Sequence, residues 1–168
     1  MLEKEQRREK ILYVIIHNIR SAYNVGAIFR TADGAGAAKI YLTGHTPAPH
    51  DSRNERYQTK AQKMIAKTAL GAEDWVKWET ANDIMGLIAE LKENNFEIIA
   101  LEQAKGSVNI DSFKPKFPCA LILGNEVDGM ERDILEKADK VVEIPMKGKK
   151  ESLNVSVAAG IAIYSILL

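Results

Sequence analysis

The chain has 168 residues, of which 46% are hydrophobic and 27% charged, so it is long enough for one domain with its own core. This apolar fraction, with only 11 glycines and 5 prolines, excludes a disordered or low-complexity chain. The 23 basic and 23 acidic residues cancel, which excludes a protein that is basic overall and still allows a local basic patch.

Short apolar runs alternate with stretches of helical periodicity along the chain. The predicted order is strand 11–16, helix 23–35, strand 39–43, helix 56–69, edge strand 75–78, helix 84–94 capped by Asp83, strands 97–101 and 119–123, helix 131–137, strand 141–144 and a terminal helix. Continuously apolar strands that alternate with helices predict an α/β fold, a parallel sheet with helices on both faces. Ligands of such sheets bind beyond the carboxyl ends of the strands.

Cysteine, histidine and hydropathy narrow the class further. The single cysteine, Cys119, lies in an apolar run and is predicted to be a core residue, as is common in the reducing cytosol. No metal site is expected, because zinc-ligand spacing is absent among the histidines, His17, His45 and His50. The longest apolar stretch, 153–168, is shorter than the ~20 residues of a membrane span. It is predicted to be a helix buried on nearly all sides in a cytoplasmic protein with no membrane association.

Three polar segments follow predicted strands. In the first, residues 18–34, Asn24 and Arg30 lie near the start and in the second turn of a helix, and Gly26 permits close backbone approach. A capped amphipathic helix with an exposed arginine accounts for the same pattern. In the second segment, 121–130, a buried strand runs into Gly-Asn-Glu and reverses at Asp-Gly. Such a turn can hold a ligand's acceptors through its N–H groups, or it is an ordinary turn.

The third segment, 143–156, connects a strand that ends at a proline to the terminal helix. Capping accounts for one of the two polar residues at the start of this helix, Ser152 and Asn154. It does not explain why so apolar a helix keeps Asn154 just inside its first turn. A polar side chain at that place needs a partner, which a ligand could supply.

Together these segments resemble the SpoU (TrmH-like) branch of the SPOUT methyltransferases, enzymes that methylate ribose 2'-hydroxyls of RNA. The similarity runs from about residue 12 to residue 168 and is strongest in N-V-G-A-I-F-R-T-A, L-G-N-E-V-D-G and I-P-M-K-G-K-K-E-S-L-N-V-S-V-A. It departs at Val127-Asp128, where relatives often have glycine plus another residue. The resemblance implies an α/β knot, in which the C-terminal part of the sheet forms a deep trefoil knot. It also implies a single catalytic domain over 1–168 without an appended RNA-binding domain.

The resemblance further implies a cofactor, S-adenosyl-L-methionine, and the residues around it. The expected cofactor-binding residues are Leu101, Gly124, Ile144, Met146 and Leu153. The expected reaction centre comprises Asn24, Arg30, Glu126, Ser152 and Asn154. Family dimers pack through the C-terminal helix region and bring the first segment of one subunit near the cofactor of the other, so a homodimer is expected.

Arg30 is often assigned as the base in this family. A guanidinium pKa above ~12 makes its deprotonation costly. We therefore expect Arg30 to bind the adjacent phosphate and polarise the hydroxyl, while phosphate or water takes the proton. In this interpretation the other residues of the reaction centre shape the pocket and orient the reacting groups.

A basic stripe is the expected contact with structured RNA. Its members recur at steps of three and four residues, which places them on one face of the predicted helix: Arg53, Arg56, Lys60, Lys63 and Lys67. A solvated helix face is the alternative, but beside a ribose-methylating site the stripe is predicted to follow RNA phosphates. The aromatic side chains are expected to pack instead, in the core or an interface for Trp75 and Trp78, and in the core for Tyr41 and Tyr164.

The sequence favours a methyltransferase acting on tRNA or rRNA over two alternatives. A catalytically silent RNA-binding protein of the same fold is disfavoured, because a decayed site should have lost some of Arg30, Glu126, Ser152 and Asn154. A generic Rossmann nucleotide-binding enzyme is disfavoured because no G-x-G-x-x-G follows the first strand, where Ile16-His17-Asn18-Ile19 stands.

Overall fold

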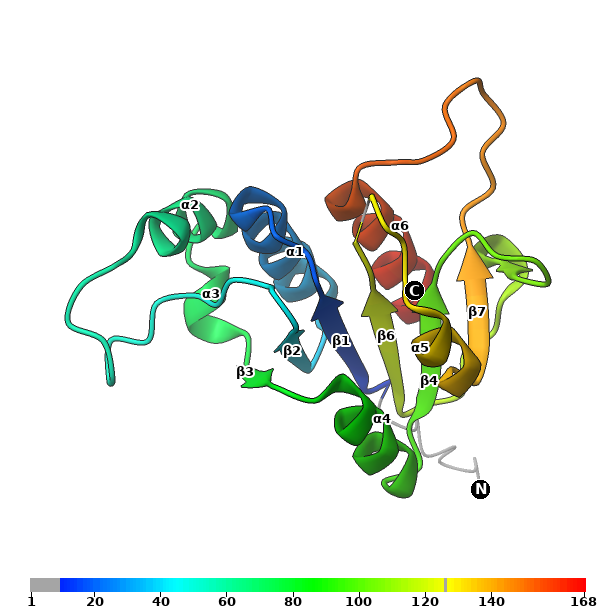
Figure 1. Cartoon of the computed structure of the whole chain (residues 1–168), viewed down its shortest axis with the longest axis horizontal. Coiled ribbons are helices and arrows are strands. Elements are labelled where there is room, and N and C mark those ends of the chain that lie inside the picture. The colour runs from blue at the N-terminus through cyan, green and yellow to red at the C-terminus, as the bar shows by residue number, and fades with distance from the viewer. Residues whose placement is uncertain (1–9, 126) are drawn as a thin grey trace, which may run out of the picture.

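A computed structural model describes residues 10–125 and 127–168. Seven parallel strands form one sheet in the order β3-β2-β1-β6-β4-β7-β5 (Figure 1). The strands are β1 Leu12–His17, β2 Lys39–Thr43, β3 Trp78–Ala81, β4 Glu97–Leu101, β5 Val108–Asn109, β6 Cys119–Leu123 and β7 Lys140–Glu143. The helices are α1 Ala22–Ala35, α2 Lys60–Ala69, α3 Ala72–Trp75, α4 Ile84–Glu93, α5 Arg132–Lys137 and α6 Val155–Leu167, with a short 3-10 helix at Ile110–Ser112. The predicted parallel α/β sheet is confirmed.

Helices cover both faces of the sheet, because successive side chains of each buried strand point to opposite faces. On one face, Val14 and Ile16 of β1 pack with α1, α2, α3 and α6. On the other face, Ile15 packs with α4 and α5. The prediction of helices on both faces is therefore confirmed (Figure 1). Since all strands are parallel, their carboxyl ends meet at one edge, where the three polar segments begin.

The predicted helix 56–69 begins four residues late, at Lys60. Thr59 caps it by accepting a hydrogen bond from the Gln62 N–H at 3.2 Å, while the Gln62 side chain accepts one from the Thr59 N–H at 2.7 Å. This capping box sets the first turn. The residues before it form a loop instead, in which the Asp51 side chain accepts a hydrogen bond from the Arg53 N–H at 3.1 Å.

Two further element assignments are corrected. The expected edge strand 75–78 is split, since Trp75 ends the short helix α3 and the edge strand β3 begins at Trp78. Gly71, in a left-handed conformation with φ of 95°, turns the chain into that helix. Strand β7 lies one residue earlier than expected. The two-residue strand β5 was not predicted, because so short an element has no periodicity to read.

The terminal helix is buried on one side only, which corrects the expectation of burial on nearly all sides. Its inner face carries the buried side chains of Ala159, Ala162 and Ile163. Its outer face exposes apolar side chains at helical spacing, with exposed fractions of 51% for Val157, 38% for Ile161, 40% for Tyr164 and 89% for Leu168. We call these four residues the α6 outer face. Tyr164 is thus not a core residue of the single chain, nor is Trp75, which is 70% exposed.

Helices α1 and α2 pack closely because Gly26 has no side chain. A Cβ atom built on Gly26 would overlap Thr68 Oγ1 and the carbonyl oxygen of Ile65. The Thr68 hydroxyl donates a hydrogen bond to the Tyr23 carbonyl oxygen at 2.9 Å across the same contact. The requirement for glycine at position 26 is therefore one of helix packing rather than of ligand approach.

The Cys119 thiol is fully buried on β6, as predicted. Burial, with a smaller contribution from the charge of Glu97, raises its pKa to about 12. Because the thiolate is the reactive form, we expect Cys119 of the native protein to react negligibly with a chromogenic thiol reagent at pH 8. The same reagent should titrate one thiol after unfolding in guanidinium chloride. Rapid stoichiometric reaction of the native protein would contradict the buried position.

Candidate active site

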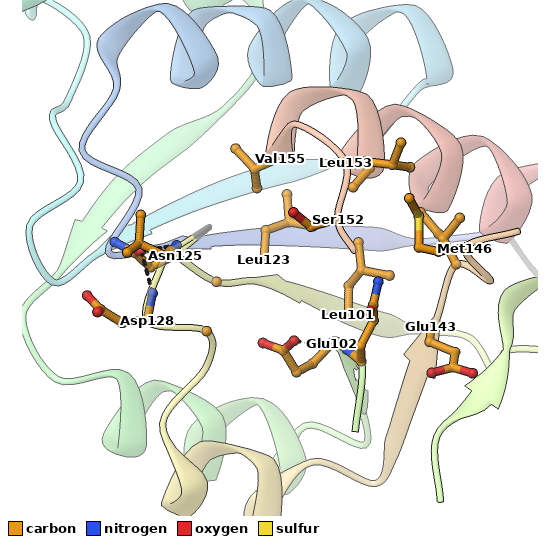
Figure 2. Close-up of a pocket in the computed structure, with 16 residues that line it drawn as sticks. Leu101, Glu102, Leu123, Asn125, Asp128, Glu143, Met146, Ser152, Leu153 and Val155 are labelled. Atoms are coloured by element: carbon orange, nitrogen blue, oxygen red, sulfur yellow. Dashed lines mark hydrogen bonds between the residues drawn. The ribbon is translucent and has the colours of Figure 1, made fainter. Parts of the chain in front are cut away.

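A cavity lies at the carboxyl ends of β4, β6 and β7, beside the start of α6 (Figure 2). It has a volume of about 400 Å³. We call it the donor pocket, after the methyl donor that the family resemblance leads us to expect there. All five expected cofactor-binding residues line it, namely Leu101, Gly124, Ile144, Met146 and Leu153. Ser152, from the expected reaction centre, lines it too. Segments from three distant parts of the chain therefore converge on one cavity.

Three of the other expected reaction-centre residues, Asn24, Arg30 and Asn154, do not line this cavity. Arg30 is exposed on α1 and lines a separate cavity with Lys67 and Tyr164. Asn24, in the first turn of α1, accepts a hydrogen bond from the Asn154 side chain at 3.3 Å. Glu126 lies outside the described residues. Within one chain, Arg30 and the donor pocket are thus separate.

Asn154 is the N-cap of α6. Its side-chain oxygen accepts hydrogen bonds from the Ser156 N–H at 2.9 Å and from the Ser156 hydroxyl at 2.6 Å. The side chain is exposed, just before the helix rather than inside it. The partners that the sequence analysis expected for Asn154 therefore lie within the protein, in the cap of α6 and in Asn24.

Asn125 folds the loop that follows β6. Its side-chain oxygen accepts hydrogen bonds from the N–H groups of Val127 at 2.7 Å and Asp128 at 3.1 Å. Its side-chain nitrogen donates to the Asn18 carbonyl oxygen at 3.0 Å, which ties the loop to the end of β1. The reversal expected at Asp128-Gly129 is present, with Gly129 at φ of 70° and its N–H bonded to the Asn125 carbonyl oxygen. The loop is thus held from inside and from a neighbouring strand.

Two residues that the sequence analysis missed hold the opposite wall. Glu102 accepts hydrogen bonds from the N–H groups of Met130 and Gln103, each at 2.9 Å. The Gln103 side chain donates to the Glu151 carbonyl oxygen at 2.9 Å. These contacts link the end of β4 to the loops before α5 and before α6. Both residues directly follow a buried strand, which is the signal that could have identified them.

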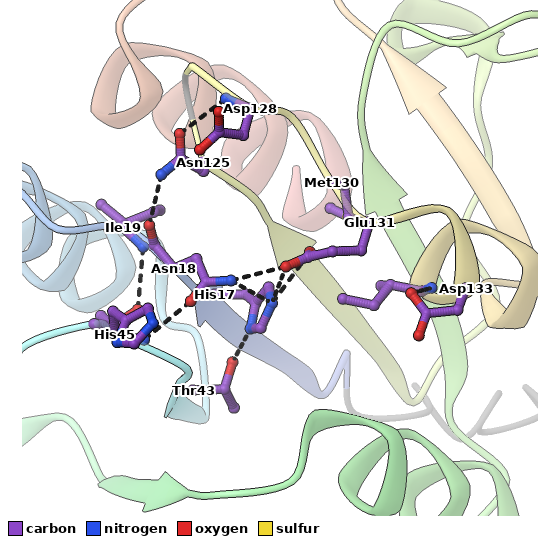
Figure 3. A network of polar contacts seen from close by, with 12 residues as sticks. His17, Asn18, Ile19, Thr43, His45, Asn125, Asp128, Met130, Glu131 and Asp133 are labelled. Atoms are coloured by element: carbon purple, nitrogen blue, oxygen red, sulfur yellow. Dashed lines mark hydrogen bonds and ion pairs between the residues drawn. The ribbon is translucent and has the colours of Figure 1, made fainter.

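A polar network lies behind the donor pocket at the ends of β1 and β2 (Figure 3). His17 is 5% exposed, and its ring contacts Thr43 Oγ1 at 2.8 Å through Nδ1 and Glu131 Oε2 at 3.2 Å through Nε2. Asn18 donates to Glu131 Oε1 at 2.9 Å and accepts from the His45 N–H at 3.0 Å. These bonds hold Asn18 in a left-handed conformation with φ of 55°. The network therefore fixes the carbonyl group that anchors Asn125.

Opposing effects act on the carboxylate of Glu131. Partial burial acts to raise the pKa of Glu131, but hydrogen bonds from its own backbone N–H and from His17 and Asn18, with the charge of His17, hold the pKa below its usual value. Glu131 is therefore ionised at neutral pH and accepts hydrogen bonds from this network.

The predicted basic stripe is only partly a helix face. Lys60, Lys63 and Lys67 are exposed on α2 at the expected spacing, whereas Arg53 and Arg56 lie in the loop before it. Arg53 pairs with Asp51 through two contacts of 2.8 and 3.0 Å, and this pairing lowers the pKa of the Asp51 carboxyl. The charge of Arg53 is thus compensated within the loop, which the helical spacing did not reveal.

Two kinds of site are absent from the part of the chain that the structure describes. No group of three or more metal-ligating side chains occurs there. None of its helices combines the length and the apolar character that crossing a bilayer requires.

Comparisons with known proteins agree on one family. Residues 11–164 match the model of the SpoU rRNA Methylase family. The chain is 33% identical over 95% of its length to the tRNA (guanosine(18)-2'-O)-methyltransferase of Aquifex aeolicus, covering 70% of that protein. It is 34% identical over 91% of its length to a 23S rRNA (guanosine-2'-O-)-methyltransferase of Ralstonia nicotianae, covering 57% of it.

Solved structures give the same result. The crystal structure of an AdoMet-bound rRNA methyltransferase from Sinorhizobium meliloti superposes with a TM-score of 0.80 and 28% identity, over 92% of this chain and 55% of that one. The chain thus spans between about half and three quarters of the relatives it matches. The matched family model covers most of the chain and includes all three polar segments, so this protein belongs to the SpoU rRNA methylase family.

Proposed function

We propose that this protein is an S-adenosyl-L-methionine-dependent methyltransferase that acts on a ribose 2'-hydroxyl of tRNA or rRNA. The observation that carries the proposal is the donor pocket, which gathers all five expected cofactor-binding residues at the carboxyl edge of the sheet. The family membership supports it, as does the printed name of the Sinorhizobium relative as an AdoMet-bound rRNA methyltransferase.

The chemistry of the donor pocket fits this cofactor. A volume of about 400 Å³ lies within the usual range for small-ligand sites. Leu101, Met146 and Leu153 offer apolar contact to an adenine ring, while the strand ends offer backbone N–H and C=O groups. Carboxylates of Glu102 and Glu143 line the same cavity, and their negative charge favours a cation such as the sulfonium.

In the proposed reaction the protein places the reacting groups and stabilises charge. S-adenosyl-L-methionine supplies the methyl group, which bonds to the ribose 2'-oxygen as its bond to sulfur breaks and a neutral thioether leaves. Placement in line contributes up to roughly 7–11 kcal/mol to such a transfer. Arg30 binds the phosphate beside the target ribose and polarises the hydroxyl, whose proton passes to phosphate or water.

A homodimer through the α6 outer face completes the proposed site. An exposed stripe of four apolar side chains favours association with a second apolar surface. Arg30 lines a cavity that also includes Tyr164 of this face, so it lies beside the proposed dimer contact. In the proposed dimer, Arg30 of the partner subunit complements the donor pocket, as the family resemblance implies. We expect light scattering at micromolar concentration to give twice the mass of the chain. A stable monomer there would contradict the shared site.

The exposed lysines of α2 are the proposed contact with RNA phosphates. Lys67 lines the same cavity as Arg30, so the basic face of α2 continues to the proposed phosphate-binding arginine. Such contacts make the affinity for RNA fall as salt rises. Arg56 can add to this surface, whereas Arg53 is already paired with Asp51. Because the substrates are tRNA or rRNA, a cytoplasmic location is proposed with this function.

A C-terminal trefoil knot is proposed for the same region. The sheet order places β4 between β6 and β7, so the connection from β6 to β7 crosses over β4, which supports this proposal. The bond from Gln103 to Glu151 holds the loop after β4 against the loop that leads into α6. A crystal structure traced from β4 to α6 would test this. An untwisted path, with α6 passing outside the loop between β4 and β6, would contradict the knot.

Two measurements test the proposed activity. Calorimetry with S-adenosyl-homocysteine should detect binding well below millimolar concentration, and absence of binding would favour a catalytically silent RNA-binding protein. Incubation of total RNA with the protein and a methyl-labelled cofactor should then label RNA at ribose 2'-oxygens. Mapping 2'-O-methyl positions with and without the protein identifies the target. Binding without any methylation would contradict the proposed activity.

Asn125 should control donor affinity through the loop after β6. In Asn125→Asp the side chain can still accept from Val127 and Asp128, but it loses the donor to the Asn18 carbonyl oxygen. One hydrogen bond of about 0.5–1.5 kcal/mol, plus repulsion between two oxygens, predicts a roughly 10-fold weaker affinity for S-adenosyl-homocysteine. Calorimetry measures it, with Asn94→Asp as the control, because the Asn94 side chain also donates to a backbone carbonyl oxygen, that of Glu90, and lines neither this pocket nor the cavity of Arg30. Unchanged affinity would show that the anchor is dispensable.

A further inference from the structure

A second cavity borders the donor pocket at the carboxyl ends of β1, β2 and β6. It has a volume of about 250 Å³, and we call it the base pocket. Four of its residues line it alone: Asn18, Arg20, His45 and Glu131. Three more line both cavities: Asn125, Asp128 and Gly129. Described residues of the loop after β6 thus border both cavities.

In the wall of this cavity, Asn18 is hydrogen-bonded to both Glu131 and Asn125 (Figure 3). The Asn18 amide group is bonded to Glu131 and to the His45 N–H, and the Asn18 carbonyl oxygen to Asn125. The His17 ring also contacts the Glu131 carboxylate, at 3.2 Å. The side chains of this wall therefore cannot rearrange without breaking several polar contacts. It is a rigid support of the kind that recognition sites require.

Other polar groups at the cavity are unused. The Arg20 guanidinium, the His45 ring and the Asp128 carboxylate have no hydrogen-bond or ion-pair partner among residues 10–125 and 127–168. All three side chains are exposed, so they can meet a ligand. The cavity therefore presents both donors and acceptors, in contrast to the exposed lysines of α2.

This mixture of charges selects between parts of an RNA. A phosphate would be repelled by the carboxylates of Asp128 and Glu131, whereas a nucleobase edge offers the N–H donors that carboxylates accept. Guanine suits the set best. It presents adjacent N–H donors on its Watson–Crick edge to a carboxylate, and its O6 and N7 acceptors match an arginine fork.

We propose that the base pocket binds the guanine base of the nucleotide whose ribose is methylated. The inference rests on the proposed function. A ribose carries its base on C1' and its 2'-hydroxyl on the neighbouring C2', so a hydroxyl at the donor pocket places the base within one sugar of it. The cavity beyond the Asn125–Gly129 loop is that neighbouring space. Asp128 accepts from the guanine N–H groups, and Arg20 donates to the O6 and N7 side.

The test uses transcripts that carry each of the four bases at the mapped methylation position. The wild-type protein should methylate the guanosine transcript with the highest kcat/KM. Arg20→Ala, whose side chain lines only the base pocket, should reduce the preference for guanosine by roughly 10-fold, as expected for loss of one base contact, with little change for the other bases. Asp128→Asn should reduce the same preference by roughly 10-fold, measured as the ratio of kcat/KM between guanosine and the other bases, because Asp128 also lines the donor pocket. The matched controls are Arg132→Ala and Asp111→Asn, whose exposed side chains line neither cavity. Both controls should keep the wild-type preference.

Donor binding separates recognition from folding and from the activity itself. Arg20→Ala, whose side chain lines only the base pocket, should bind S-adenosyl-homocysteine as the wild type does. Equal methylation of all four transcripts by the wild type would overturn the base pocket and leave the methyltransferase proposal standing. A uniform loss across the four transcripts in Arg20→Ala would also overturn it, because it would assign this cavity to the RNA backbone. If the wild-type protein neither binds S-adenosyl-homocysteine nor methylates any transcript, the proposed function itself is refuted.

Discussion

Replacing Arg30 with alanine is expected to lower kcat for RNA methylation by about 100- to 1,000-fold, the usual cost of removing one group that stabilises charge in a transition state. Arg30 is exposed and lines a cavity separate from the donor pocket. The affinity for S-adenosyl-homocysteine should therefore stay unchanged, and the free energy of unfolding should change by no more than about 0.5 kcal/mol. Single-turnover methylation with calorimetry and urea unfolding measures all three quantities.

Arg30→Lys separates the two roles discussed for this residue. Lysine keeps the positive charge but lacks the planar fork that binds a phosphate through two hydrogen bonds. We expect Arg30→Lys to retain most of the defect of Arg30→Ala. Near-normal turnover of the lysine variant would argue against a role specific to the fork. Mixing Arg30→Ala with a donor-pocket variant should restore part of the activity if one subunit supplies Arg30 to the other.

Gly26→Ala is expected to destabilise the fold by about 2–3 kcal/mol, as overpacking of a tight contact typically does. The added Cβ would overlap two atoms of α2, the backbone carbonyl oxygen of Ile65 and the side-chain hydroxyl of Thr68. The backbone nitrogen of Ala69 would lie 3.0 Å from it. Backbone cannot move aside as a flexible side chain can. The helices would have to separate, which also disturbs Arg30 on α1 and Lys67 on α2. Urea unfolding followed by circular dichroism measures the loss.

Gly160→Ala is the matched control, because it makes the same substitution in another helix that packs on the sheet, α6. The Cβ at position 160 would meet only Thr31 Cγ2 at 3.8 Å, an ordinary contact. Alanine favours helix by up to about 1 kcal/mol over glycine, so this variant should be neutral or more stable. Equal stability of Gly26→Ala and the wild type would mean that α1 and α2 do not pack as the structure has them.

Local patterns predicted the elements that carry strong local signals. Strands β2, β4 and β6 occupy the predicted residues because each is a continuous apolar run bounded by turn residues. Asp83 caps α4 as expected, accepting a hydrogen bond from the Met85 N–H at 3.0 Å. The start of helix α2 was misplaced because the spacing of basic residues extends upstream of the capping box at which the helix begins. Periodicity reports a face, but a cap decides where the helix begins.

Some residues of the candidate site were predicted from sequence motifs, whereas others became visible only through their contacts in the structure. The motifs around Gly124, Ile144 and Leu153 pointed to residues that the structure brings together in one cavity. Glu102 and Gln103 carry no motif, and their part became visible only through their hydrogen bonds to other loops. The role of Asn18 was likewise hidden, since it depends on partners 27 and 113 residues away.

The amino-acid sequence by itself determined the order of strands and helices, the parallel sheet and the three segments at its carboxyl edge. These follow from hydrophobic patterning and turn chemistry, which act between residues near one another in the chain. Only the tertiary structure decided that Arg30 stands apart from the donor pocket, that α6 leaves an apolar face uncovered and that a second polar cavity adjoins the first. Those features depend on contacts between residues distant in the chain, which no local pattern encodes.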